Sequence, residues 1–288
     1  MTPKPPGGAT PVQGAGVFKR RTLIERWIEG SGSPHLAIIG RTGAGKTSLC
    51  KKIVLHLYMR NENVVVIDFD GEYSDLPLST ITPPFKIPEI TPWILSQISR
   101  PEEGGYGISG VALSLEDIRN SAGARFIDDA ISQIRHDPSI PPNIKFATIW
   151  RLKVLKKYFD EGHDEHPRNI RYDLSTILDV RERQAAQQIL VSVSMLNSDS
   201  KWIVVEEGVS GTWLSDILIL ARRRGKRIIF ISQSLPSQSQ ITNFEVILFT
   251  PYITDMRTFP LPLPVHPSTD KGLWWIGSLG VHRIKHVW

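Results

Sequence analysis

A glycine-rich stretch followed by a lysine and a threonine is the clearest chemical signal in the sequence. Residues 40–47 read GRTGAGKT and match the pattern G-x-x-x-x-G-K-[ST] in full. Gly40, Gly43 and Gly45 would let the backbone adopt positive φ and approach phosphate oxygens without a Cβ clash. The helix that follows would point free N–H groups at the anion, with Lys46 on the β- and γ-phosphates and the Thr47 hydroxyl on Mg²⁺. The predicted nucleotide-binding residues are Gly40, Arg41, Thr42, Gly43, Ala44, Gly45, Lys46, Thr47 and Ser48.

Two adjacent glutamates end an apolar run in the stretch KWIVVEEG, residues 201–208. An enzyme with a phosphate-binding loop needs an acid at the end of a neighbouring strand to hold Mg²⁺, and a hydrolytic one also needs a base that orients water. Because a strand end relaxes the alternation of side chains, Glu206 could serve the metal and Glu207 the water. We favour this interpretation over a solvated strand end, since the run WIVV has the character of a buried strand.

Three other carboxylates compete for the metal role. Asp68, Asp70 and Glu72 follow a second valine-rich strand in the stretch VIDFDGEYSDL. They could hold the metal in place of Glu206, and the sequence leaves this alternative open. His163 and His166 stand beside two acids in EGHDEHP, but no cysteine or helix would hold them, so we expect a solvated loop there.

The composition limits the class of protein. The chain has 288 residues, 41% of them hydrophobic, with a formal net charge of +5 and one cysteine, Cys50. One cysteine excludes an intramolecular disulfide and a cysteine zinc site, and we expect Cys50 to pack in the core. No apolar run approaches the ~20 residues of a membrane span and no secretory signal is visible, so we expect a soluble, cytoplasmic protein. The basic balance is compatible with binding to nucleic-acid phosphates.

Strand and helix patterns alternate along the chain, which predicts an α/β fold with a mostly parallel sheet. Residues 1–16 are expected to form a flexible Pro/Gly-rich tail, and residues 17–288 a single domain with a helical insertion at about 79–160. The sequence GSLG predicts a turn between two short C-terminal strands. Predicted helices cover 18–30, 47–60, 121–136, 148–159, 181–198 and 212–225, and predicted strands cover 34–40, 63–73, 169–175, 201–207, 227–234 and 244–250.

The series of motifs resembles the HerA/FtsK superfamily of DNA-pumping ATPases. The quoted residues are TGAGKT, then VVVIDFDGEYSDL, then YDLS before a glutamine-rich helix, then IVVEEG, then LARRRGKRIIFISQSLPS. The D-x-x-GEYS element resembles the HerA branch in particular, and the likeness covers roughly residues 34–240. It implies a P-loop NTPase of the RecA/FtsK-like type that uses ATP and Mg²⁺.

The resemblance also implies roles for single residues. Lys46 and Thr47 match the phosphate and metal residues, and Glu207 matches the catalytic glutamate of the usual Asp-Glu pair. Glu206 departs from the family's aspartate, and Gln233 matches a polar sensor of the γ-phosphate. Arg222 stands where relatives carry an arginine that reaches into a neighbouring subunit's site, although Arg223 or Arg224 could do so and a solvated helix end would also favour arginines.

We therefore expect an ATP-driven double-stranded DNA translocase that works as a homo-oligomeric, hexameric ring. Its size resembles genome-packaging ATPases of tailless double-stranded DNA viruses, which implies a capsid or portal partner and a place in the host cytoplasm or the virion. Plasmid conjugation, or DNA repair with a nuclease partner, is the alternative within the superfamily. A P-loop kinase for a nucleotide or small molecule is the alternative from another class. We expect Trp274, Trp275 and Trp288 to be core or subunit contacts rather than bases' stacking partners.

Overall fold

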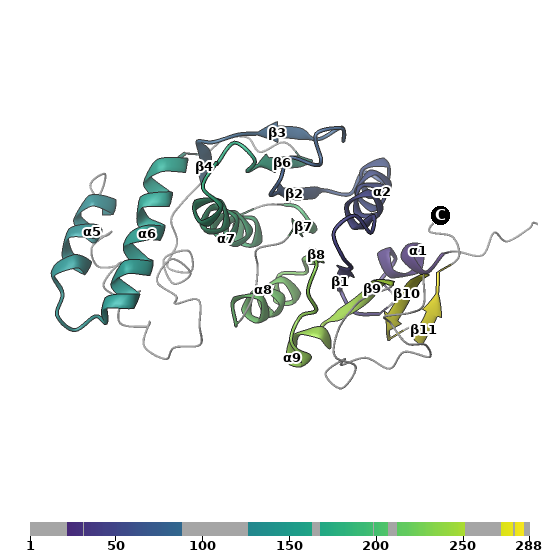
Figure 1. Cartoon of the computed structure of the whole chain (residues 1–288). Helices are drawn as coiled ribbons and strands as arrows, with labels where there is room; N and C mark the ends of the chain where they lie inside the picture. Colours follow the sequence, from purple (N-terminus) through teal and green to yellow (C-terminus); the bar gives the residue numbers. More distant parts are fainter. Residues whose placement is uncertain are drawn as a thin grey trace, which may run out of the picture.

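The computed structural model describes most of the chain (Figure 1). The described residues are 22–30, 32–87, 126–162, 168–197, 199–206, 212–250, 272–278 and 280–284. The predicted tail, the loop with His163 and His166, Glu207 and Trp288 lie outside these residues. Within them, no helix combines the length and apolarity needed to cross a bilayer.

A nine-stranded sheet forms the centre of the molecule, in the order β11-β10-β9-β1-β8-β7-β2-β6-β3. The strands from β9 to β3 in this order pair in parallel, whereas β10 and β11 are antiparallel additions at one edge. This confirms the predicted α/β fold and the predicted C-terminal hairpin. The parallel strands are β1 (His35–Ile39), β2 (Val64–Asp68), β3 (Ser79–Ile81), β6 (Ile170–Asp173), β7 (Trp202–Glu206), β8 (Arg227–Ser232) and β9 (Phe244–Thr250), and the hairpin strands are β10 (Gly272–Gly277) and β11 (Gly280–Arg283).

Helices cover both faces of the sheet, as Figure 1 shows for α2 on one side and α7 and α8 on the other. Successive residues of a strand face opposite sides, so Leu36 and Ile38 belong to one buried cluster and Ala37 and Ile39 to the other. Both faces of the central strands are therefore apolar, as expected for a parallel sheet between two helical layers. The bounds of four of the helices are α1 (Leu23–Ile28), α2 (Lys46–Met59), α7 (Val180–Asn197) and α8 (Thr212–Arg223).

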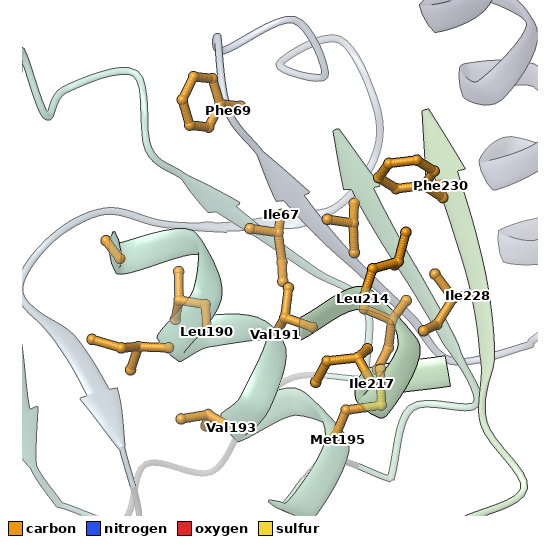
Figure 2. Packing of buried hydrophobic residues seen from close by; sticks show 14 of the residues in the cluster. Ile67, Phe69, Leu190, Val191, Val193, Met195, Leu214, Ile217, Ile228 and Phe230 are labelled. Atoms are coloured by element: carbon orange, nitrogen blue, oxygen red, sulfur yellow. The ribbon is translucent and has the colours of Figure 1, made fainter. Parts of the chain in front are cut away.

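Figure 2 shows the larger of these clusters, in which side chains from α7 and α8 pack against the strands. Val191 of α7 and Ile217 of α8 are each at most 1% exposed. Ile67 of β2 lies against them, and Phe230 of β8 closes the cluster near the carboxyl ends of the strands. This packing fixes α7 and α8 to the sheet. It therefore also fixes the positions of the loops that connect these two helices to the strands.

The region between β3 and β6 contains structure that the sequence did not fully reveal. Helices α5 (Phe126–His136) and α6 (Pro142–Tyr158) pack on each other, and α6 begins six residues before the predicted Thr148 because proline is well suited to the first helical turn. Strands β4 (Phe85–Ile87) and β5 (Phe159–Glu161) form a separate parallel pair. At three residues each, they are too short to show a readable alternation. The short helix α9 (Gln238–Ile241) was also not predicted.

Buried tryptophans support the amino-terminal edge of the sheet and the hairpin. The Arg227 guanidinium lies 4.6 Å from the ring centres of both Trp27 and Trp202 and donates to the last carbonyls of α1. Trp275 is fully buried and donates its indole N–H to Glu245 of β9 at 3.0 Å. Trp274 is 6% exposed, so Trp274 and Trp275 are buried residues, in agreement with the expected core role.

His35, the first residue of β1, connects β1, β8 and α8. Its Nδ1 accepts the Ile228 N–H at 3.2 Å, which leaves Nε2 to donate to the Leu218 carbonyl at 3.2 Å. The pKa of His35 is lowered to about 4, chiefly by burial and in smaller part by the charges of Arg222 and Arg227, while the hydrogen bond to the Leu218 carbonyl opposes the shift. The folded state therefore requires the neutral imidazole.

This predicts a stability loss in mild acid. The neutral form of His35 contributes fully above its unfolded pKa of 6.5, and the contribution falls as the pH drops toward the folded value of about 4. Between pH 7.5 and pH 5 the loss should be about 2 kcal/mol in the free energy of unfolding. Urea unfolding of the wild type and of His35→Gln at both pH values measures it. The variant should lack this part of the pH dependence, and an equal loss in both proteins would contradict the assignment.

Candidate active site

The glycine-rich loop connects β1 to α2 at the carboxyl-terminal edge of the sheet. Gly43 and Gly45 have φ values of 75° and 95°, as predicted, because only glycine adopts this region at little cost. Gly40 is not among the positive-φ residues, so that part of the prediction was wrong. Its lack of a side chain serves close packing instead, since a Cβ at Gly40 would lie 2.7 Å from the Phe249 Cβ.

The start of α2 presents backbone N–H groups that have no acceptor within the helix. Gly45 is its N-cap residue and supplies no side-chain hydrogen bond to the first turn, so N–H groups of that turn remain available. Lys46 is the first helical residue and is 8% exposed. Its Nζ donates to the Arg41 carbonyl at 3.0 Å, which holds the ammonium group over the loop. The positive charge of Lys46 and the N–H groups of the first helical turn thus lie together where the sequence predicts phosphate binding.

A cavity of about 130 Å³ lies beside this loop. It is formed where β1, β7 and β8 end and where the turn after β2 begins. The structure thus brings together the predicted loop residues, the predicted metal acid, the predicted sensor and two of the rival acids. The lining residues are Thr42, Gly43, Lys46, Thr47, Asp70, Glu72, Glu206, Ile231 and Gln233.

Glu206 is the last residue of β7, and its carboxylate points at the loop. One oxygen, Oε1, accepts the Thr47 hydroxyl at 3.0 Å and the Tyr73 hydroxyl at 3.2 Å. The side chain is only 6% exposed. The pKa of Glu206 is raised to about 7: burial is the main cause, the nearby negative charges of Glu72 and Asp68 contribute, and the hydrogen bonds from the two hydroxyls oppose the shift. A cation bound here would restore the charged form.

The donor set fits Mg²⁺ in a nucleotide site. The Thr47 hydroxyl and the Glu206 carboxylate are oxygen ligands, the type that Mg²⁺ prefers. In the part of the chain that the structure describes, no cluster of three or more His, Cys, Asp or Glu side chains could hold a metal by itself. Mg²⁺ commonly binds through one or two carboxylates together with nucleotide phosphates and waters, which is the arrangement that Thr47 and Glu206 would allow.

Asp68 does not face the cavity, so its candidacy for the metal role is not supported. Its carboxylate accepts the backbone N–H groups of Glu72 and Tyr73, both at 3.0 Å, and pairs with Arg171 at 2.7 Å. The residue is fully buried. Arg171 also pairs with Asp173 at 2.7 Å. Asp68 therefore holds the turn that follows β2.

Asp70 and Glu72 remain at the cavity. Asp70 pairs with Arg183 of α7 at 2.9 Å, and its side chain is 60% exposed. Glu72 is exposed and contributes to the negative potential around Glu206. These two rivals therefore stand at the rim, whereas Glu206 alone of the four acids contacts the Thr47 hydroxyl.

Gln233 follows β8 and meets the loop directly. Its Oε1 accepts the Thr42 hydroxyl at 2.8 Å. The contact joins the glycine-rich loop to the end of a neighbouring strand, across the mouth of the cavity. Gln233 thus lies at the cavity beside the glycine-rich loop, together with other predicted residues of the site.

Glu207 lies outside the described residues, but the backbone of the preceding residue, Glu206, is fixed by a hydrogen bond. The buried Gln187 of α7 donates its side-chain amide to the Glu206 carbonyl. The other polar atom of that amide, Oε1, is buried and has no hydrogen-bond partner among the residues that the structure describes. Sequence reasoning missed both Gln187 and Tyr73 as parts of the site. The glutamine-rich helix contains Gln187 and the GEYS element contains Tyr73, so both segments were noticed in the sequence. Spacing alone does not show that these two side chains point at Glu206.

Arg222 lies at the opposite edge of the sheet from the cavity. It borders a separate hollow of about 300 Å³ with Pro34, Lys201 and Arg227 at the amino-terminal ends of the strands. The five residues of β1 separate the two edges, which is about 16 Å. Arg222, Arg223 and Arg224 are all exposed. Arg222 is therefore not brought together with the other predicted residues of its own chain.

The chain is similar to known proteins in sequence and in fold. The family model described as helicase HerA, central domain, matches residues 30–205. VirB4 of Thermoanaerobacter pseudethanolicus has a similar structure, with a TM-score of 0.63 and 13% identity over 87% of this chain and 88% of VirB4. The bacterial conjugative coupling protein TrwBdeltaN70 has a TM-score of 0.59 and 13% identity over 87% of this chain and 84% of its own.

Two further comparisons carry less weight. The genome packaging NTPase B204 from Sulfolobus turreted icosahedral virus 2 has a TM-score of only 0.42, at 11% identity over 88% of this chain and 97% of its own. No curated protein matches in sequence. The family model, however, covers more than half of the 288 residues, and the parallel sheet and glycine-rich loop agree with it. The chain belongs to the family of the HerA helicase central domain, within the HerA/FtsK superfamily of P-loop ATPases.

Proposed function

We propose that the chain is an ATP-hydrolysing double-stranded DNA translocase that works as an oligomeric ring. The observation that carries the ATPase part is the contact of Thr47 with Glu206, at 3.0 Å, beside Lys46 in one cavity. These residues come from a phosphate-binding loop and from the end of another strand, the two parts that a P-loop ATPase must bring together. Family membership supports the same activity.

Each residue would have a separate task in hydrolysis. Lys46 and the N–H groups at the start of α2 would hold the β- and γ-phosphates. Thr47 and Glu206 would hold Mg²⁺, which when bound neutralises charge on the phosphates. Glu207 would orient the attacking water, and Gln233 would contact the terminal phosphate from the far side of the loop.

The ring and the DNA are supported by different features. The two edges of the sheet are about 16 Å apart, and Arg222 is exposed at the edge away from its own chain's cavity, so we propose that it acts on the cavity of a neighbouring copy. A homo-oligomeric ring, for which we propose six subunits, would supply that neighbour. The net charge of +5 favours contact with DNA phosphates, which position a duplex without reading its sequence.

The process that the motor serves depends on its docking partner. We propose viral genome packaging with a capsid or portal partner, in the host cytoplasm or the virion, as the first candidate. Conjugation is the second, favoured by the similarity to VirB4 and to TrwB. TrwB has been solved with GDPNP and with ADPNP, non-hydrolysable analogues of GTP and ATP, which supports nucleotide binding by this chain.

DNA-stimulated ATP turnover is the first test. We expect the purified chain to hydrolyse ATP faster when double-stranded DNA is added, and the stimulation to weaken as salt rises because phosphate contacts are screened. Lys46→Ala should abolish turnover under both conditions. ATP turnover that is unchanged by DNA but increases with a small phosphate acceptor would favour a kinase and contradict the proposed DNA translocase.

The two glutamates should fail in different ways. We expect Glu207→Gln to bind ATP normally and to lose about 10²–10⁴-fold in turnover, because a glutamine cannot accept the proton of the attacking water. Glu206→Gln should also weaken Mg²⁺-dependent nucleotide binding, by at least about tenfold. Fluorescence titration with a labelled ATP, with and without Mg²⁺, separates the two. Unchanged hydrolysis in Glu207→Gln would remove it from the mechanism.

A mixing experiment tests whether sites are shared. Arg222→Ala should lower turnover by about 10³-fold or more if the arginine stabilises the transferred phosphoryl group. Mixing Arg222→Ala with Lys46→Ala subunits should restore part of the activity, because an intact loop can then meet a neighbour's intact Arg222. Lys46→Ala mixed with Glu206→Gln is the matched control, since both damage the same site and should give no rescue. Absence of rescue at every ratio in the first mixture would contradict a trans role for Arg222.

A further inference from the structure

We propose that Tyr73 is a positioning residue for the metal site, and that its hydroxyl fixes the Glu206 carboxylate for Mg²⁺. This inference rests on the nucleotide and Mg²⁺ part of the proposed function but not on DNA translocation. It assigns a role to the GEY turn after β2, which the phosphate chemistry described above does not use.

The hydrogen bonds of the Glu206 carboxylate are unequal. Oε1 accepts two hydroxyls, from Thr47 at 3.0 Å and from Tyr73 at 3.2 Å. No donor from the described part of the chain contacts Oε2. Two donors converging on one oxygen set the rotation of the carboxylate and leave the other oxygen available. A ligand to a cation needs just such an oxygen, with its direction already determined.

The tyrosine itself is held from several sides. It is fully buried, in the cluster that packs against α2 and includes Cys50. Its backbone N–H donates to Asp68 at 3.0 Å, and Asp68 is in turn fixed by Arg171 at 2.7 Å. Gly71 has a φ of 79°, and a Cβ there would lie 3.0 Å from the Ser175 hydroxyl. The turn is thus constrained at its glycine and at its tyrosine, so the hydroxyl has a defined place.

The arrangement also accounts for a glutamate at this position. A glutamate has one more rotatable bond than an aspartate, so it loses more conformational entropy when it is held in one place. The hydrogen bond from Tyr73 supplies part of that restriction in advance of metal binding. Groups that orient a metal ligand commonly change metal affinity by about 10–100-fold when they are removed. Removal of the Tyr73 hydroxyl should therefore weaken binding of the cation and leave binding of the metal-free nucleotide unchanged.

The test is Tyr73→Phe, which keeps the ring and removes the hydroxyl. Tyr172→Phe is the matched control, because Tyr172 is 3% exposed, packs on Phe85, and makes no hydrogen bond through its hydroxyl among the described residues. Binding of Mn²⁺ by the 288-residue chain with a non-hydrolysable ATP analogue is followed by the loss of the free Mn²⁺ paramagnetic resonance signal. We expect Tyr73→Phe to weaken Mn²⁺ binding about tenfold, with analogue binding in the absence of metal unchanged, and Tyr172→Phe to bind as the wild type does.

A double-mutant cycle excludes a merely structural effect. If Tyr73 acts through Glu206, adding Tyr73→Phe to Glu206→Gln should cost much less Mn²⁺ affinity than it costs in the wild type. An unchanged Mn²⁺ affinity in Tyr73→Phe, or an equal loss in both backgrounds, would overturn the inference and leave the ATPase proposal intact. Conversely, a chain with the Tyr73 effect but no response of ATP turnover to DNA would overturn the DNA motor and leave this inference intact.

Discussion

Parallel pairing of the central strands decides where every candidate residue of the site can lie. Parallel strands end at the same edge of a sheet, so the loop after β1, the acid at the end of β7 and the glutamine after β8 meet there. Thr47 and Glu206 are separated by 159 positions in the sequence, yet they form a hydrogen bond because β1 and β7 are both neighbours of β8. A strand order in which β1 and β7 did not both flank β8 would move these two side chains apart.

Gathering acids at one edge has an electrostatic cost that the chain offsets in two different ways. Asp68 is fully buried and is neutralised by Arg171, which also pairs with Asp173, so this group is complete without a ligand. Glu206 is almost as buried but accepts only hydroxyls, and its pKa is raised to about 7. Asp68 already has a guanidinium partner and supports the backbone, whereas Glu206, with hydroxyl partners, is suited to bind a cation.

The sequence was most informative where a local pattern has one physical meaning. The GRTGAGKT loop, the buried strands and the amphipathic helices follow from glycine conformations and from alternation, and the structure contains them. The alternation of strand and helix patterns along the chain also allowed the parallel sheet to be predicted. The features that the sequence did not reveal depend on contacts between distant segments. They are the pairing of the short strands β4 and β5, the inward direction of Asp68, and the contact of Tyr73 with Glu206. None of these leaves a periodic signal in its own segment.

The distance between the two edges of the sheet would have a physical role in the proposed oligomer. β1 carries the phosphate loop at its carboxyl end and His35 at its amino end, and His35 is bonded to the Leu218 carbonyl one turn before Arg222. A shift of β1 on nucleotide binding would therefore reach α8 through one buried, uncharged contact. If Arg222 acts on a neighbouring subunit, the same strand connects the phosphates of one site to the arginine that serves the next. A ring would then need no additional element to pass the state of one subunit to another.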